Sequence, residues 1–326
     1  MFNNFQTPFN AVVAVYTVIV LGMICRKCGA FSRETTDSVL KLVVNVLTPC
    51  LIASKTLSNP AFSDIRNIIY PPLTGMAVIL IGLIVGLFYG FFLSGQWTGL
   101  KNRQQICTFA VCVGMLNYGY VPIPLIQDLY PGDNRLLAVL FMQNIGTEFM
   151  LWTFCVFILM GSFSWETCRR IINVPACAIL GTMILNITGY DACIPELAMK
   201  PVCIVGESTI PMSLFFAGAS IIDFWDLKGG GSFKQTFQLA FGSSLIRLLI
   251  LPFLIILLAK YVPCSRELKI VLVVHASMAS AVFPIILARI YNGDVKTAIT
   301  TVLSNSLLAL ATTPLWIAFG LKYLNL

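Results

Sequence analysis

The chain has 326 residues, of which 58% are hydrophobic and only 11% are charged, and its mean hydropathy is +0.87. Soluble domains carry roughly 25% charged residues, so this composition excludes a soluble globular protein and makes lipid the main solvent of the chain. The formal charge of +7 does not indicate nucleic-acid binding, because the basic residues stand in short gaps between apolar runs, where they orient membrane helices.

Ten apolar segments follow one another along the chain, each close to the roughly 20 residues that a helix needs to cross a bilayer. No Lys or Arg precedes the first segment, whereas Arg26, Lys27 and Arg33 follow it, which favours a retained first span over a cleaved signal peptide. The ten segments cover residues 9–25, 39–58, 70–93, 105–127, 136–160, 171–190, 201–222, 233–259, 268–290 and 296–320.

The distribution of basic residues predicts the orientation of these spans. If the N-terminus lies outside, the inner loops hold eleven Lys and Arg residues, and the outer loops with the C-terminus hold seven. Cytoplasmic loops carry the excess of positive charge, so the sequence predicts that both termini lie outside. The expected location is the plasma membrane, or the inner membrane of a bacterium, with the chain crossing it many times.

The two halves of the chain share a pattern. Residues 130–135 (Tyr-Pro-Gly-Asp-Asn-Arg) resemble residues 291–296 (Tyr-Asn-Gly-Asp-Val-Lys), 161 positions later, and the same offset relates Asn144 to Asn305. Pro49 and Pro211 lie 162 positions apart, each in the second span of its half. We therefore predict two five-helix repeats, residues 1–160 and 171–326. Because five is odd, the second repeat enters the membrane from the opposite side, as in many secondary transporters.

The fourth and ninth segments are predicted to be broken helices. Pro122 and Pro124 in the fourth cannot both continue a helix, and the ninth carries Pro284 after a run of small residues. Irregular backbone at membrane depth survives only where it is buried in protein or lines a wet cavity. Interruptions at matching positions of two repeats therefore indicate a transport site, where the N-termini of half-helices attract anions. The alternative is a simple proline kink, which we favour for Pro211 or Pro252 taken alone.

These breaks and the polar residues near them define the predicted substrate site. Asn117 can both donate and accept hydrogen bonds, whereas Asn144 and Asn305 either bridge helices or face the breaks. The residues predicted to bind substrate are Asn45, Asn117, Tyr118, Gly119, Pro122, Pro124, Asn144, Ser280, Pro284 and Asn305.

Charge inside a span is costly and tends to be functional, and the candidates are Glu148, Glu207, Arg247 and His275. Lys41 and Lys55 lie near the ends of the second span, where their side chains reach the membrane surface. Arg247 either neutralises a substrate carboxylate or pairs with Glu207, and we favour the ion pair. His275 can bind a proton near neutral pH, although a hydrogen-bonded packing role is the commoner one. Glu207 precedes Pro211 by four residues, as Asn45 precedes Pro49, which predicts a role near the site as a proton or cation carrier.

Catalysis and metal binding are not expected. The eleven cysteines are an odd number and lie mostly in apolar runs, so they do not form a disulfide framework. Cys25 and Cys28 have no second pair and no nearby histidine to complete a metal site. Asp133 and Asp294 fall in turns on opposite faces of the membrane, which excludes an intramembrane aspartyl protease. We therefore expect neither an enzyme nor a cofactor.

Several motifs resemble the auxin efflux carrier family, which includes plant auxin exporters and bacterial carriers of malonate or malate. They are Asn117 followed by Pro124, Pro49, the segment 283–292 (Phe-Pro-Ile-Ile-Leu-Ala-Arg-Ile-Tyr-Asn), Asn173-Val174-Pro175 and the last span around Leu307–Pro314. The resemblance covers all ten spans. Pro122 stands where a glycine is more usual, and Ala279 replaces a frequent proline. The short linker around residues 161–170 favours a compact, prokaryote-like carrier over an auxin exporter.

The resemblance implies an all-helical fold of ten spans with crossed broken helices in spans 4 and 9. It implies a scaffold domain of spans 1, 2, 6 and 7, and a transport domain of the others that moves like an elevator. By the same resemblance, substrate carboxylates bind beside the crossing, where Asn117, Pro124 and Pro284 mark the site.

The leading hypothesis is therefore a carrier of a small organic anion. Its transport is coupled to protons, to sodium or to neither, and a homodimer is one candidate assembly. A sodium-coupled symporter of the bile-acid type shares the general plan. It ranks lower because the acidic ligand expected next to Asn117 is missing. A receptor or channel that does not transport substrate is the third alternative.

Overall fold

The computed structural model describes residues 3–93, 98–162, 165, 169, 172–225 and 233–326, so part of the central linker around residues 161–170 lies outside the described residues. The described secondary structure is helical apart from one isolated β-bridge. Within the described part, seven helical segments are long and apolar enough to cross a membrane. They are Pro8–Lys27, Arg33–Thr56, Arg66–Phe92, Asn134–Met160, Glu196–Asp223, Phe233–Tyr261 and Val295–Tyr323.

The three other predicted spans are the short or interrupted ones. The sixth corresponds to α10 (Val174–Thr188), an apolar helix of only 15 residues. The fourth is divided into α5 (Arg103–Gly114) and α6 (Pro122–Leu129), and the ninth into α15 (Arg266–Ser277) and α16 (Phe283–Ile290). The prolines therefore interrupt these two segments where the sequence predicted, and neither half-helix is long enough to cross a bilayer alone.

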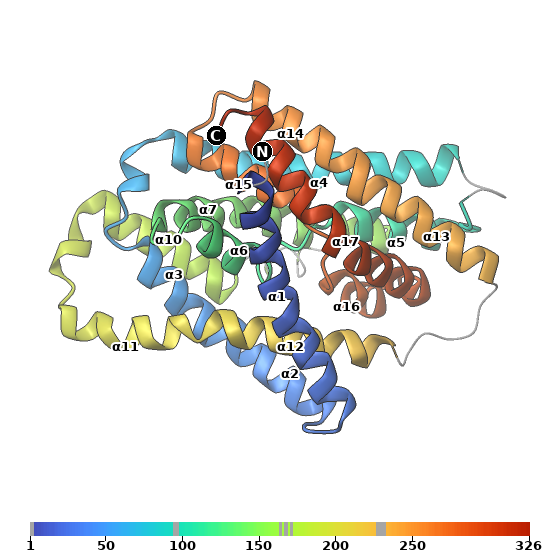
Figure 1. The fold of residues 1–326 in the computed structure, drawn as a ribbon, viewed down its shortest axis with the longest axis horizontal. Helices are drawn as coiled ribbons and strands as arrows, with labels where there is room; N and C mark the ends of the chain where they lie inside the picture. The colour runs from blue at the N-terminus through green and yellow to red at the C-terminus, as the bar shows by residue number, and fades with distance from the viewer. Residues whose placement is uncertain (1–2, 94–97, 163–164, 166–168, 170–171, 226–232) are drawn as a thin grey trace.

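One group of helices forms around α1 (Asn3–Lys27). α1 packs along α12 (Thr209–Trp225), which also contacts α2 (Arg33–Leu42), while α3 (Thr48–Thr56) packs on α10 and α11 (Glu196–Glu207). α1 crosses α12 so closely that a Cβ at Gly22 would lie 1.8 Å from the Phe215 carbonyl oxygen. Glycine is therefore required where these backbones touch (Figure 1). We call α1–α3 and α10–α12 the first helix group.

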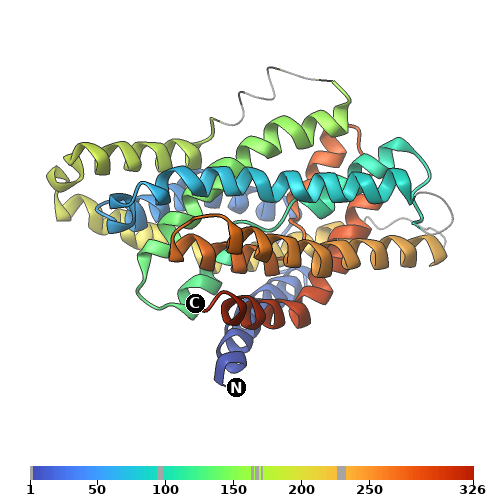
Figure 2. The ribbon, with the colours of Figure 1, turned by 90° about the horizontal axis from the view of Figure 1, so that it is seen from above.

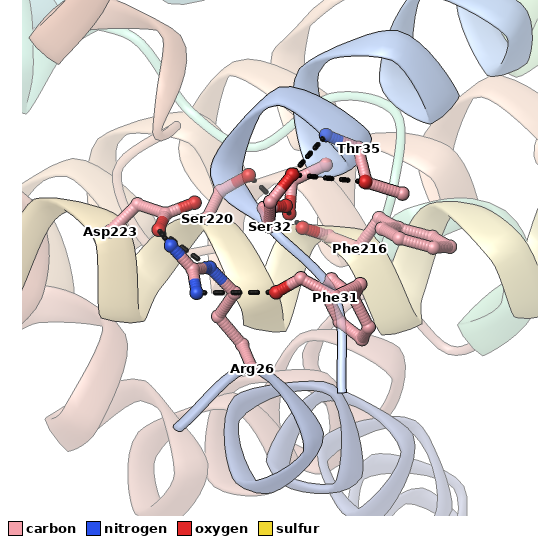
Figure 3. Close-up of polar contacts among 8 residues, drawn as sticks. Arg26, Phe31, Ser32, Thr35, Phe216, Ser220 and Asp223 are labelled. Carbon is pink, nitrogen blue, oxygen red and sulfur yellow. Dashed lines mark hydrogen bonds and ion pairs between the residues drawn. The ribbon is translucent and has the colours of Figure 1, made fainter. Parts of the chain in front are cut away.

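A partly buried ion pair joins the end of α1 to α12 within the first helix group (Figure 3). The Arg26 guanidinium at the end of α1 contacts Asp223 of α12, with Nη2 2.6 Å and Nε 2.8 Å from Oδ1. Arg26 Nη1 also donates to the Phe31 carbonyl at 3.3 Å, and the Phe31 ring packs on two phenylalanines of α12. Ser32 then caps α2 by accepting from the Thr35 N–H at 3.2 Å. These contacts fix the turn between α1 and α2 against α12.

The remaining long helices form a second helix group. α4 (Arg66–Phe92) packs on α5 and α7 (Asn134–Met150), and α17 (Val295–Tyr323) packs on α5, α13 (Phe233–Leu245) and α15. α14 (Leu251–Tyr261) continues α13 and packs on α15. Figure 2 shows the α13–α14 rod running roughly parallel to α4. We call α4–α8 and α13–α17 the second helix group, and it meets the first where α1 contacts α6 and α17 and where α3 contacts α7.

Short turns of other helix types join the long helices. A π-helical turn separates α2 from α3, another separates α7 from α8 (Val156–Met160), and a third separates α13 from α14. Pro252 follows the third of these turns and cannot donate to the Leu248 carbonyl, which accepts from the Trp316 indole at 2.7 Å instead. The turns are η1 (Val43–Leu47), η2 (Pro60–Ser63), η3 (Leu151–Cys155), η5 (Tyr190–Cys193) and η6 (Ile246–Ile250).

Candidate functional site

The two broken helices meet at their breaks. Leu116 and Ser280 form an antiparallel β-bridge, in which the Asn117 N–H donates to the Ala279 carbonyl and the Ala281 N–H donates to the Met115 carbonyl, both at 2.9 Å. The backbone is already extended at the residues that follow α5 and α15. The two segments between the half-helices, residues 115–121 and 278–282, thus give each other hydrogen bonds that a broken helix lacks. We call this arrangement the crossing.

A half-helix begins immediately after each segment of the crossing. Pro122 stands at the first position of α6 and Pro284 at the second of α16, where the missing N–H costs no helical hydrogen bond. Neither start has a side-chain cap, because Val121 and Val282 occupy the capping positions. The partial positive charge of two helix N-termini therefore lies at the crossing without a side-chain acceptor to offset it.

A small cavity of about 40 Å³ lies between the crossing and the first helix group. Asn117 and Ser280 provide polar groups to its wall, and the residues facing them from α1 and α12 are largely apolar. Such a space admits a few water molecules, so it must widen to admit an organic anion. The lining residues are Tyr16, Ile19, Asn117, Val121, Ala217, Ile221, Met278, Ala279, Ser280, Val282 and Ser306.

Asn144 and Asn305, 161 positions apart, each donate a hydrogen bond to one segment of the crossing. The Asn144 amide of α7 donates to the Tyr118 carbonyl at 3.1 Å. The Asn305 amide of α17 donates to the Ser280 hydroxyl at 2.8 Å and accepts from Ser244 at 3.1 Å. Each asparagine thus bridges its helix to the break of its own half, which combines the two roles that the sequence left open.

Arg247 of η6 binds the end of the half-helix α15. Its Nε donates to the Met278 carbonyl at 2.8 Å and its Nη2 donates to the His275 carbonyl at 3.2 Å, while its side chain is completely buried. A cation at a helix C-terminus is favourable because the last carbonyls lack helical partners. The ion pair expected with Glu207 is wrong, because Glu207 is exposed and the described residues show no ion pair for either of them.

Glu148 of α7 lies between the crossing and the first helix group. Its Oε1 accepts from the Tyr118 hydroxyl at 2.6 Å, and its Oε2 accepts from the Trp152 indole at 2.9 Å and the Asn173 amide at 3.3 Å. Asn173 also caps α10, because its Oδ1 accepts from the Ala176 N–H at 2.9 Å. The sequence marked Glu148 as a charged residue inside a span but did not predict these partners.

Comparisons with known proteins identify the family. A family model described as membrane transport protein matches residues 7–168 and 165–317. The chain belongs to this family. It is 23% identical over 321 residues to an uncharacterised transporter of Methanothermobacter thermautotrophicus, covering 96% of this chain and 98% of the other. It is 21% identical over 322 residues to an uncharacterised transporter of Methanocaldococcus jannaschii, covering 95% and 97%. The match confirms the resemblance to auxin efflux carriers.

Two predicted site residues of this membrane transporter lie away from the crossing. Asn45 is exposed in η1, and its amide donates to the Lys41 carbonyl at 2.9 Å. Glu207 is exposed at the end of α11, and neither residue lines the cavity. Each stands four residues before a proline that interrupts helical hydrogen bonding. Their shared position therefore reflects two proline kinks, and the prediction that both lie near the site is corrected.

His275 of the transporter is completely buried on α15, beside the Arg247 guanidinium. Proton binding by His275 would place a second positive charge next to a buried first one, which a dry interior disfavours. This arrangement favours a packing role for His275, but not a hydrogen-bonded one, because neither ring nitrogen has a hydrogen-bond partner among the described residues.

The other predicted residues shape the breaks of the transporter without lining its cavity. Pro122, Pro124 and Pro284 are buried in the first turns of α6 and α16. A Cβ added at Gly119 would meet no atom within 4 Å, so this half-buried glycine is not needed for close packing. Sequence reasoning missed the opposite wall of the cavity, because residues such as Tyr16 of α1 lie in uniformly apolar runs that carry no signal of a site.

Proposed function

We propose that this membrane transporter is a secondary carrier of a small organic anion, with a carboxylate bound at the crossing. The observation that carries the proposal is the cavity between the crossing and the first helix group, bordered by Asn117 and Ser280. Uncapped helix N-termini and side-chain amides are suited to carboxylate oxygens. No Asp or Glu stands among the residues that line this cavity, so no carboxylate of the wall would contact a bound anion.

The buried Arg247 strengthens this preference. It donates to the carbonyl of Met278, a residue of the cavity wall, and does not itself line the cavity. In a medium of low dielectric constant, a positive charge acts over several ångströms, so Arg247 favours anions without touching them.

The proposed mechanism is elevator-type alternating access. The first helix group, formed from predicted spans 1, 2, 6 and 7, acts as the scaffold. The second group, formed from spans 3–5 and 8–10, carries the substrate. The packing of the helices into two groups supports this division, as does the position of the cavity at their boundary. We further propose the ten-span inverted repeat with both termini outside, in which two halves of similar structure give two states of similar energy.

Counterflow of radiolabelled carboxylates tests the proposal. The purified protein, reconstituted in proteoliposomes, should exchange at least one of malonate, malate and succinate with saturation. Asn117→Ala should abolish this exchange, because it removes an amide from the cavity wall, and it should still elute as a folded, monodisperse protein. Asn45→Ala is the matched control, because it removes an exposed amide outside the cavity. Wild-type exchange by Asn117→Ala would remove the crossing as the substrate site.

A further inference from the structure

The Glu148 carboxylate is held by three neutral donors from different parts of the molecule. Tyr118 belongs to the crossing, Trp152 to the helical segment that carries Glu148, and Asn173 to the first helix group. The Trp152 ring also contacts Phe283 edge-on at 5.7 Å, so the cluster reaches the start of α16 as well. Glu148 therefore contacts, directly or through Trp152, both broken helices and the opposite helix group.

Among the residues that the structure describes, the negative charge of Glu148 has no ionic partner. The ion pairs that join two described residues are Arg26 with Asp223 and Arg66 with Asp64, and neither includes Glu148. Among the described residues, the titratable groups that face Glu148 are the phenols of Tyr118 and Tyr120, both from the crossing, and Asn173 and Trp152 are uncharged. A carboxylate away from bulk water without a cation depends on its hydrogen bonds, so the loss of one donor favours the protonated form.

One of the three donors is fixed in the first helix group. Asn173 caps the N-terminus of α10 and therefore stays with the first helix group. Glu148, Tyr118 and Trp152 belong to the second helix group. Any sliding of one group along the other therefore breaks the bond between Asn173 and Glu148 and keeps the other two.

We propose that Glu148 is the proton-binding group that couples transport to a pH gradient, and that Asn173 controls when it binds the proton. This inference rests on the proposed carrier function. When the groups separate, a proton from water on one side binds a Glu148 oxygen and forms a neutral carboxylic acid. When the Asn173 bond re-forms in the other state, the acid releases that proton to water on the other side. One proton therefore crosses in each cycle, without any redox step.

Proteoliposomes test the coupling with the carboxylate of the malonate, malate and succinate panel that the wild type exchanges. A pH gradient of about one unit supports about tenfold accumulation for one coupled proton. Glu148→Gln should lose this accumulation and keep counterflow, which needs no net proton movement. Asn173→Ala keeps the carboxyl but loses a donor, and should shift the midpoint of the pH profile upward by about one unit. Tenfold accumulation by Glu148→Gln would overturn the proposal.

A second measurement needs no substrate. Difference infrared spectroscopy of the protein in lipid nanodiscs should show a protonated carboxyl band that titrates in the wild type and is absent in Glu148→Gln. In Asn173→Ala the band should appear at higher pH. No titrating band from Glu148 would overturn the proton site even if the carrier function holds. A titrating band without exchange of any carboxylate would support the proton site and reject the anion-carrier function.

Discussion

At the scale of single residues, Arg247 gives the sharpest prediction about substrate charge. Arg247→Gln removes a buried positive charge that contacts Met278 of the cavity wall, and it should lower the affinity for the transported carboxylate by about tenfold, equivalent to about 1.4 kcal/mol. The measurement is the half-saturation concentration in counterflow. Arg289→Gln, which removes an exposed charge on α16, is the control and should leave affinity unchanged. Equal affinities in both variants would show that Arg247 only stabilises the end of α15.

Polar residues inside apolar spans can be found from the sequence, but their partners cannot. Arg247 bonds to carbonyls 28 and 31 residues away, which are available only because α15 ends there. Backbone carbonyls have no signature in the sequence, so the pairing with Glu207 was the simplest expectation, and it was wrong. Glu148 likewise bonds to residues 25 and 30 positions away. The repeated offset marked Asn144 and Asn305, but it left open whether they bridge helices or face the breaks.

At the scale of secondary-structure elements, the prolines predicted both breaks, but not how the breaks meet. The loss of a donor at Pro122, Pro124 and Pro284 is a local property and can be deduced from the residue type. The antiparallel bridge between Leu116 and Ser280 depends on the register of two segments more than 160 residues apart, which short-range patterns do not encode. The same local reasoning misjudged Asn45 and Glu207, because a proline kink in a packed helix and one at a site look alike.

The bridge itself can be tested with proline substitutions at two neighbouring positions. Ala281→Pro removes the N–H that donates to Met115 and should reduce transport strongly, because the crossing loses one of its two backbone bonds. Ala279→Pro is the matched control. Ala279 contributes its carbonyl to the bridge, and Met278 before it is extended, with ψ of 142°, as a residue before proline prefers.

Counterflow in proteoliposomes, with elution profiles to confirm folding, separates the two variants. Ala279→Pro should retain most of the wild-type rate, in keeping with the proline that related carriers often have at this position. Equal loss in both variants would mean that any proline disrupts this segment, and that the hydrogen bond from Ala281 has no special role.

At the scale of the whole molecule, composition and the length of the apolar runs were sufficient to predict a helical membrane protein. Seven of the ten predicted segments are long apolar helices in the structure, and the other three are the short α10 and the two broken pairs. The grouping of helices was not deducible from hydropathy, because a helix facing lipid and a helix facing another helix are equally apolar. Only the resemblance to a known family suggested which spans pack together.

Relative movement of the two helix groups is the prediction that decides the mechanism. The test introduces Glu148→Cys and Asn173→Cys into a variant without exposed native cysteines. These two positions lie in different helix groups, and their native side chains are in direct contact. A short bis-thiol crosslinker between them should stop counterflow, and reduction should restore it, because an elevator requires the groups to slide. The reduced double variant should exchange substrate, since counterflow does not need Glu148.

A crosslink within one group is the matched control for this experiment. Ser58 and Asn186 both belong to the region of α3 and α10, where the Ser58 N–H donates to Asn186 Oδ1 at 2.6 Å. The pair Ser58→Cys and Asn186→Cys should therefore exchange substrate equally well before and after crosslinking. If the crosslinked 148–173 pair also continued to exchange substrate, the site would have to open by local changes at the crossing. The division into scaffold and moving group would then be wrong, while the crossing could still bind the anion.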